Sequence, residues 1–132
     1  MAVSFVFAFE SVAIVKNISG EVYAKRDSKK VRLKAGDQLS QGDILLTKSN
    51  SSVGVIFEDG TLLSLGENSI LSINRYLFKP STNQFDIDLN MKKGTSAFES
   101  GKIGKLSPKS VKFRVPQGTI GIRGTKFYVE VK

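Results

Sequence analysis

Residues 51–65, "SSVGVIFEDGTLLSL", contain the pattern that decides the fold class. Apolar side chains stand at every second position on both sides of a turn: Val53, Val55, Phe57, Leu63 and Leu65. A period of two is typical of β-strands that bury one face. The turn itself, Asp59-Gly60, favours a two-residue type I′ hairpin, because both central positions of that turn need positive φ. The stretch therefore predicts an antiparallel β-hairpin.

The same alternation recurs along the chain, and no segment has a clear helical period. Further alternating runs lie at 21–24, 85–91, 111–115 and 127–131, and polar loops lie at 79–84 and 100–110. Gly36-Asp37 and Gly42-Asp43 predict two close turns around a short strand that holds Leu39. A chain of 132 residues has the size of one domain. We therefore predict an all-β fold, a single domain of short antiparallel strands and hairpins that form a β-sandwich or a rolled β-stack.

The composition excludes several classes of chemistry. The chain has no Cys and no His, so it has no thiolate nucleophile, histidine base, Cys/His zinc site or disulfide. Asp37 and Asp43 follow glycines, which favours carboxylates that accept local backbone hydrogen bonds; an acid and base pair of a hydrolase is the weaker alternative. We expect no catalytic residue.

A second group of acidic residues imitates the start of a calcium loop. Asp86, Asp88 and Asn90 match its first three ligand positions, but Met91 and Ala97 stand where an EF-hand needs Gly and Glu. We interpret the three residues as a solvated strand face. The sequence therefore predicts no metal ligand and no cofactor.

The net charge of +8 predicts an anionic partner. Cationic residues are densest in "KRDSKKVRLK", and the candidate binding residues are Lys25, Arg26, Lys29, Lys30, Arg32 and Lys34. Arg32 and Lys34 alternate with Val31, Leu33 and Ala35, so the alternative is simply the solvated face of a half-buried strand.

Three evenly spaced glycines precede the last alternating run, in "PQGTIGIRGTKFYVEV" at 116–131. Gly118, Gly121, Gly124 and Thr125 do not match a Walker loop or a dinucleotide fingerprint, since no helix follows and the spacing differs. We interpret the glycines as positions of positive φ or of close approach to another strand. Arg123, between two of them, is either a structural lock or a clamp for a ligand carboxylate or phosphate.

The N-terminus is apolar but short. Residues 1–8 are interpreted as the remnant of a signal peptide, with residues 9–132 as the β domain. The alternative is a first strand, Val12 to Val15, extended backwards. No run approaches the roughly 20 apolar residues of a transmembrane helix.

Taken together, several motifs resemble the FecR-type domain of bacterial anti-sigma regulators. They are "GDILLT" at 42–47, the "DGT" at 59–61, Ser69-Ile70, "KKG" at 92–94 and "FRVPQGTIGIRGTKFYVEV" at 113–131. The structural part of this pattern includes Gly42, Asp43, Asp59 and Gly60. The resemblance, to a standalone form of the family, implies an all-β domain beyond the inner membrane that binds a protein or ligand without catalysis.

We therefore predict a periplasmic or extracellular binding and sensory module that recognises a protein partner or an anionic envelope glycan. The alternative is an OB-like nucleic-acid-binding domain, for which base stacking on aromatic residues is needed. Only Tyr23, Tyr76 and Tyr128 are expected to face outward, whereas the phenylalanines of the alternating runs are expected in the core. A nucleic-acid partner is therefore the less favoured prediction.

Overall fold

The computed structural model describes residues 10–122 and 126–132. These residues form twelve strands: β1 (Ala13–Ser19), β2 (Val22–Arg26), β3 (Lys29–Arg32), β4 (Gln38–Leu39), β5 (Ile44–Thr47), β6 (Ser52–Phe57), β7 (Leu62–Leu65), β8 (Ile70–Lys79), β9 (Gln84–Glu99), β10 (Val111–Val115), β11 (Gly118–Ile120) and β12 (Lys126–Val131). The short helical segments are η1 (Pro80–Thr82), α1 (Lys102–Leu106) and η2 (Pro108–Ser110). The all-β prediction is confirmed.

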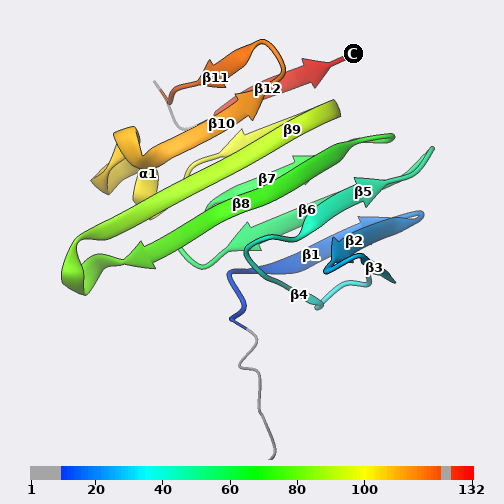
Figure 1. Ribbon diagram of the computed structural model, residues 1–132, viewed down its shortest axis with the longest axis horizontal. Helices are drawn as coiled ribbons and strands as arrows, with labels where there is room; N and C mark the ends of the chain where they lie inside the picture. Colours follow the sequence, from blue (N-terminus) through cyan, green and yellow to red (C-terminus); the bar gives the residue numbers. More distant parts are fainter. Residues whose placement is uncertain (1–9, 123–125) are drawn as a thin grey trace, which may run out of the picture.

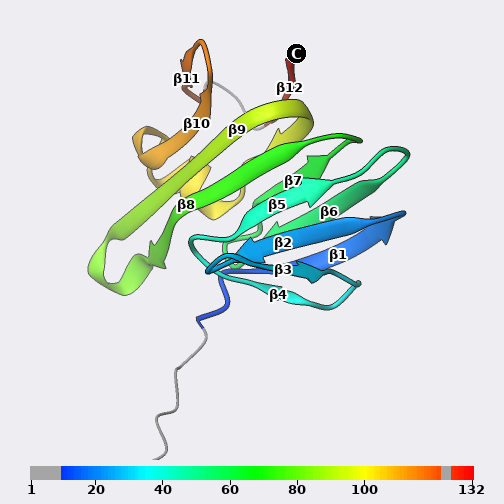
Figure 2. The same ribbon diagram turned by 45° about the vertical axis from the view of Figure 1, so that its right-hand side comes forward.

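The strands form one sheet that curls into two layers joined by β9 (Figures 1 and 2). The first layer has the order β3-β2-β5-β8-β9-β10-β11 and uses residues 84–93 of β9. The second layer has the order β4-β1-β6-β7-β9-β12 and uses residues 94–99. The pairing of β9 with β10 is parallel, whereas the other described pairs are antiparallel.

Strand β9 passes from one layer to the other at Gly94. Its buried apolar residues stand at every second position up to Met91, and burial resumes at Ser96 with the opposite phase. Gly94 has φ of 104°, and a Cβ atom there would collide with Ser69. A glycine is therefore required where the strand turns its other face to the core.

The two Gly-Asp pairs mark two further crossings between the layers. Gly36-Asp37 lies between β3 in the first layer and β4 in the second, and Gly42-Asp43 leads from β4 back to β5 in the first. Both glycines have positive φ, 93° and 94°. Each aspartate accepts the backbone N–H of the residue three positions earlier, at 2.9 Å. The predicted turns around a short strand are confirmed.

The predicted type I′ turn at Asp59-Gly60 is wrong, although the β6–β7 hairpin itself is present. Only Gly60 has positive φ, 89°, and its N–H donates to the carbonyl of Phe57. The loop is therefore longer than two residues, with glycine as its one left-handed position. The two-residue loop with positive φ at both positions joins β2 to β3 instead, at Asp27 and Ser28, with φ of 49° and 68°.

The core lies between the layers and includes residues from both. Phe98 stacks on Phe127 with ring centroids 5.1 Å apart, and Phe113 meets both rings edge-on at 5.9 and 5.4 Å. Phe98 and Phe127 belong to the second layer and Phe113 to the first, so this aromatic cluster joins the layers. The core prediction is confirmed for Phe57 and Phe113, which are buried, whereas Phe85 and Phe127 are partly buried and pack against the core.

Strand β3 departs from the predicted half-buried pattern. All four of its residues are exposed, including Val31, which is 45% exposed, and Ala35 beyond the strand is exposed as well. Only Leu33 is buried, 6% exposed. The reason is that, within the described residues, β3 pairs only with β2 and forms the edge of the first layer.

Candidate functional site

Asp59 is the centre of a buried hydrogen-bond network and is only 2% exposed. Its carboxylate accepts the backbone N–H and the hydroxyl of Thr61, at 3.2 and 2.8 Å, and the N–H of Ile103, at 3.1 Å. Its main-chain carbonyl accepts the N–H of Lys102 at 2.9 Å. The residue therefore fixes the β6–β7 turn and the start of α1, which hydrophobic patterning alone does not reveal.

Tyr76 on β8 completes this network. Its hydroxyl donates to the Asp59 carboxylate at 2.8 Å and accepts the Asp59 N–H at 2.9 Å. Burial, followed by the hydrogen bond to Asp59, raises the pKa of Tyr76 well above its usual value, so the hydroxyl stays protonated. The expectation that Tyr76 faces outward is wrong, since it is 6% exposed and stacks on Phe57 at 5.1 Å.

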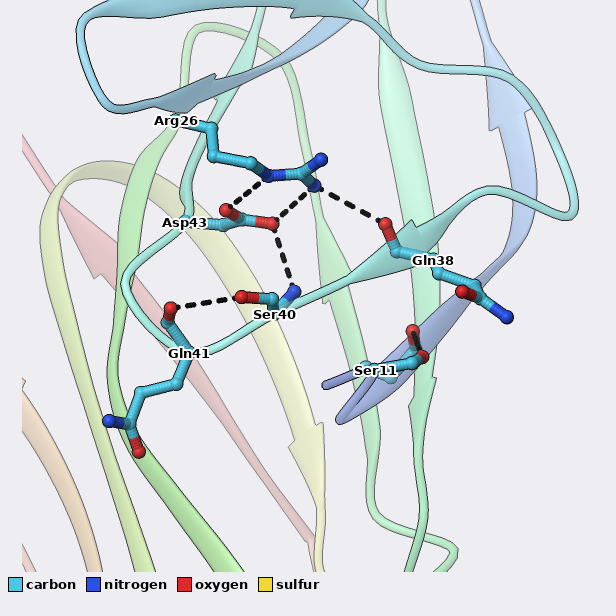
Figure 3. A network of polar contacts seen from close by, with 7 residues as sticks. Ser11, Arg26, Gln38, Ser40, Gln41 and Asp43 are labelled. Carbon is cyan, nitrogen blue, oxygen red and sulfur yellow. Dashed lines mark hydrogen bonds and ion pairs between the residues drawn. The ribbon is translucent and has the colours of Figure 1, made fainter. Parts of the chain in front are cut away.

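Asp43 is buried under a planar arginine (Figure 3). The Nε and Nη2 atoms of Arg26 donate to its two carboxylate oxygens at 2.8 and 2.7 Å, and Ser40 N–H donates at 2.9 Å. The hydrogen bond to Asp43 raises the pKa of Arg26. Nη2 also donates to the Gln38 carbonyl on β4 at 3.4 Å, so this pair links the two layers at their edge.

A third polar cluster holds the crossing from β7 to β8. The Thr47 hydroxyl donates to the carbonyl of Gly66 at 2.6 Å and accepts the N–H of Ser69 at 2.8 Å. The Ser69 hydroxyl accepts the N–H of Thr95 at 3.1 Å, beside the bend of β9. Asp43 and Thr47 of "GDILLT" and Asp59 and Thr61 of "DGT" therefore form internal hydrogen bonds that stabilise the fold.

The candidate binding cations lie on the exposed β2–β3 hairpin. The register places Lys25 opposite Lys30 and Arg26 opposite Lys29, with Arg32 opposite Tyr23. Across the described ranges, 10–122 and 126–132, no ion pair joins Lys25, Lys29, Lys30, Arg32 or Lys34 to an acidic side chain. Arg26 differs from these five because its guanidinium is engaged by Asp43.

A residue that the sequence did not single out, Lys48, joins this hairpin. The Nζ atoms of Lys30 and Lys48 lie 4.4 and 5.9 Å from the centroid of the Tyr23 ring. Lys48 follows β5, which pairs with β2, and its N–H donates to the carbonyl of Glu21. The pairing of β5 with β2 brings Lys48 close to the hairpin, so the distribution of charges along the sequence does not reveal that Lys48 belongs to this surface.

The predicted solvated face at 86–90 needs a correction. Asp88 is 8% exposed, and Arg114 on β10 donates to both of its oxygens at 2.9 and 3.1 Å. Burial opposes the charged form, but the bonds from Arg114 prevail and lower the pKa of Asp88. Arg114 lies on β10, the parallel neighbour of β9, and is 26 positions from Asp88 in the sequence. The sequence pattern therefore does not reveal the pair.

The structure describes only part of the C-terminal glycine stretch. Gly118 has positive φ, 152°, as predicted. Gly121 has no positive φ, and no described residue lies close to it, so the prediction for Gly121 is wrong within the described residues. Arg123, Gly124 and Thr125 lie outside the described residues, as do residues 1–8. The expected final strand is present as β12.

A separate recess of about 500 Å³ lies along β7, β9 and β12 in the second layer. Ser64, Gly66, Ala97 and Tyr128 contribute to its lining, and Glu130 is the one charged residue among those that line it in the described part of the chain. Among the described residues no cation lines this recess, whereas several lie on the β2–β3 hairpin. The basic hairpin is therefore the better candidate.

Two further findings concern the part of the chain that the structure describes. It contains no group of three or more acidic side chains placed to hold a metal ion. None of the helices within it is long and apolar enough to cross a membrane.

The scaffold residues can be compared with known families. The family model described as "FecR protein" matches residues 43–132, beginning at Asp43 and including Asp59, Tyr76 and Asp88. The chain belongs to the FecR family. No curated protein and no solved structure matches it significantly.

FecR proteins are bacterial, envelope-associated and non-enzymatic, with a regulatory and sensory role in iron-siderophore signalling that involves protein partners. The match starts after the β2–β3 hairpin, so it covers the buried networks around Asp59 and Asp88 but not the basic strands. In this FecR domain, β2 and β3 with their cations precede the matched segment, and Lys48 lies within it.

Proposed function

We propose that this FecR domain is a non-catalytic, extracytoplasmic binding and sensory module whose β2–β3 hairpin contacts a protein partner or an anionic envelope glycan. The observation that carries the proposal is the contrast between buried and exposed charges. Asp43, Asp59 and Asp88 are buried and bonded within the scaffold, whereas the cations of β3 project from the edge of a layer. Exposed cations that form no ion pair with an acidic side chain in the described part of the chain are available to an external anion.

Edge position adds a second means of recognition. In the part of the chain that the structure describes, strand β3 pairs with β2 on one side only, and its four residues are exposed. Such a strand can pair with an extended segment of a partner protein while its lysines attract acidic side chains. Aromatic stacking is weak here, since Tyr23 is the only aromatic residue of the hairpin, which disfavours single-stranded nucleic acid.

The proposal is tested by capture from an envelope extract with two matched triple variants. Lys25→Gln/Lys29→Gln/Lys34→Gln removes three cations from the hairpin region, and Lys102→Gln/Lys105→Gln/Lys109→Gln removes three exposed cations elsewhere. We expect only the hairpin variant to lose the captured protein or glycan. Equal capture by both variants would contradict the proposal. So would a wild-type protein that captures no protein or glycan and instead binds an oligonucleotide with an affinity that falls as salt rises.

Export is tested separately. Under the proposal, residues 1–8 are the end of a signal peptide, and the mature chain begins near Phe9 in the periplasmic or extracellular fraction. Mass spectrometry of the N-terminus after cell fractionation measures this directly. An unprocessed chain in the cytosol would contradict the extracytoplasmic location.

A further inference from the structure

Tyr23, Lys30 and Lys48 bring two ammonium groups over one aromatic ring. The Nζ atoms lie 4.4 and 5.9 Å from the ring centroid, which is within the range of cation–π attraction. The Tyr23 hydroxyl donates to Glu21 at 3.0 Å, and the Lys48 N–H donates to the Glu21 carbonyl at 3.1 Å. These bonds hold the ring and the start of the Lys48 side chain in place.

The two lysines repel each other in this arrangement. Contact with Lys48, first by hydrogen bonding and then by charge, lowers the pKa of Lys30, while the Glu21 carboxylate acts in the opposite direction. The register also places Lys25 opposite Lys30 and Arg32 opposite Tyr23, so two further cations share this strand pair. An anion between Lys30 and Lys48 would remove the repulsion.

The charge and the donor type favour a particular anion. Two ammonium groups match a phosphate monoester, whose charge near neutral pH is about −1.5 to −2. A phosphodiester or carboxylate has a single charge and would compensate only one of them. Lysine binds phosphate as a point charge, whereas arginine binds carboxylate or phosphate through a planar bidentate fork, as Arg26 and Arg114 do with Asp43 and Asp88.

We propose that Tyr23, Lys30 and Lys48 form a binding site for a phosphate monoester group, carried by a sugar of an envelope glycan. This inference rests on the proposed function, which it deepens by naming the ligand chemistry and the residues. It also assigns a role to Lys48, which lies outside the basic run of the hairpin.

The site is tested by NMR titration at constant ionic strength with glucose 1-phosphate, inorganic phosphate, diethyl phosphate and glucuronate. We expect glucose 1-phosphate to shift the Lys30 and Lys48 side-chain signals saturably and to raise the pKa of Lys30, read from its Cε signal. Diethyl phosphate and glucuronate should bind at least about tenfold more weakly. Tighter binding of glucose 1-phosphate than of inorganic phosphate supports the glycan as the source, and equal binding contradicts it.

The matched variants are Lys30→Gln/Lys48→Gln and Lys105→Gln/Lys109→Gln, which remove the same charge from exposed positions. Only the first should lose glucose 1-phosphate binding, by at least about tenfold. It should fold normally, because it removes a repulsion. Equal binding by both variants, or shifts that never saturate, would overturn the phosphate site.

Failure of this site is distinguishable from failure of the proposed function. If glucose 1-phosphate does not bind but the triple hairpin variant still loses its captured partner, only the phosphate site is wrong. If capture does not depend on the hairpin while Lys30 and Lys48 bind the sugar phosphate, the hairpin role is wrong and the phosphate site stands.

Discussion

The two motif aspartates, Asp43 and Asp59, are both buried but are stabilised in different ways. Asp43 has a planar arginine, Arg26, whose side chain is 34% exposed. Asp59 has no salt-bridge partner in the described part of the chain, and its carboxylate is held by neutral donors from three separate segments. A buried carboxylate can therefore be stabilised either by one charged partner or by several hydrogen bonds from neutral donors.

The difference has a consequence for what happens when each aspartate is removed. Arg26 can regain water because it lies partly at the surface. The donors around Asp59 cannot, since Thr61 and Ile103 are fully buried and Tyr76 is 6% exposed. We therefore expect the Asp59 site to be the more sensitive of the two.

The largest effect is predicted for Asp59→Ala, which should lower the free energy of unfolding by about 3–5 kcal/mol, because several buried donors lose their acceptor. Tyr76→Phe removes one member of the network and keeps the ring stack on Phe57, so about 1–2 kcal/mol is expected. Urea unfolding measures both. A loss below about 1 kcal/mol for Asp59→Ala would show that the network is not essential.

For Asp43→Ala we expect a loss of about 2 kcal/mol, because the exposed part of Arg26 is rehydrated and the Ser40 N–H alone stays unpaired. Asp37→Ala is the matched control, since Asp37 has the equivalent position in the other Gly-Asp turn, where its carboxylate accepts the N–H of Lys34. Its loss should be about 0.5–1 kcal/mol. If Asp43→Ala is as damaging as Asp59→Ala, the contrast between the two sites is wrong.

The smallest effect is predicted for Arg114→Gln, at an ion pair that is more exposed than that of Asp43. Because Arg114 lowers the pKa of Asp88 in the folded state, the pair contributes stability above the unfolded pKa, about 3.9, and loses it as pH falls through the folded pKa. The variant should be less stable than wild type at pH 6, with a difference that shrinks below about pH 4. Thermal unfolding from pH 6 to pH 2.5 measures it; a constant difference would contradict this account.

The strands and the Gly-Asp turns could be predicted from the sequence because their signals are local. Alternation at Val53, Val55 and Phe57 reports a buried strand face directly, and glycine before aspartate reports a turn. The turn type at Asp59 could not be predicted, because the Asp59 side chain bonds Tyr76 and Ile103, 17 and 44 positions away.

The charged pairs were hidden for a similar reason. Arg26 belongs to the basic run and resembles a binding residue there, but it lies 17 positions before the aspartate that engages it. Asp88 and Arg114 are 26 positions apart and meet through a parallel pairing of strands. The resemblance to FecR proteins pointed to Asp43 and Asp59, but it could not say which partners bury them.

Native-state hydrogen exchange compares the two aspartate sites in one experiment. We predict that the amide protons of Thr61 and Ile103, which bond to Asp59, exchange only through global unfolding, whereas that of Ser40, which bonds to Asp43, also exchanges by local opening at the edge of the layers. Faster exchange at Thr61 and Ile103 than at Ser40 would contradict the claim that the Asp59 network is the more stable centre of the scaffold.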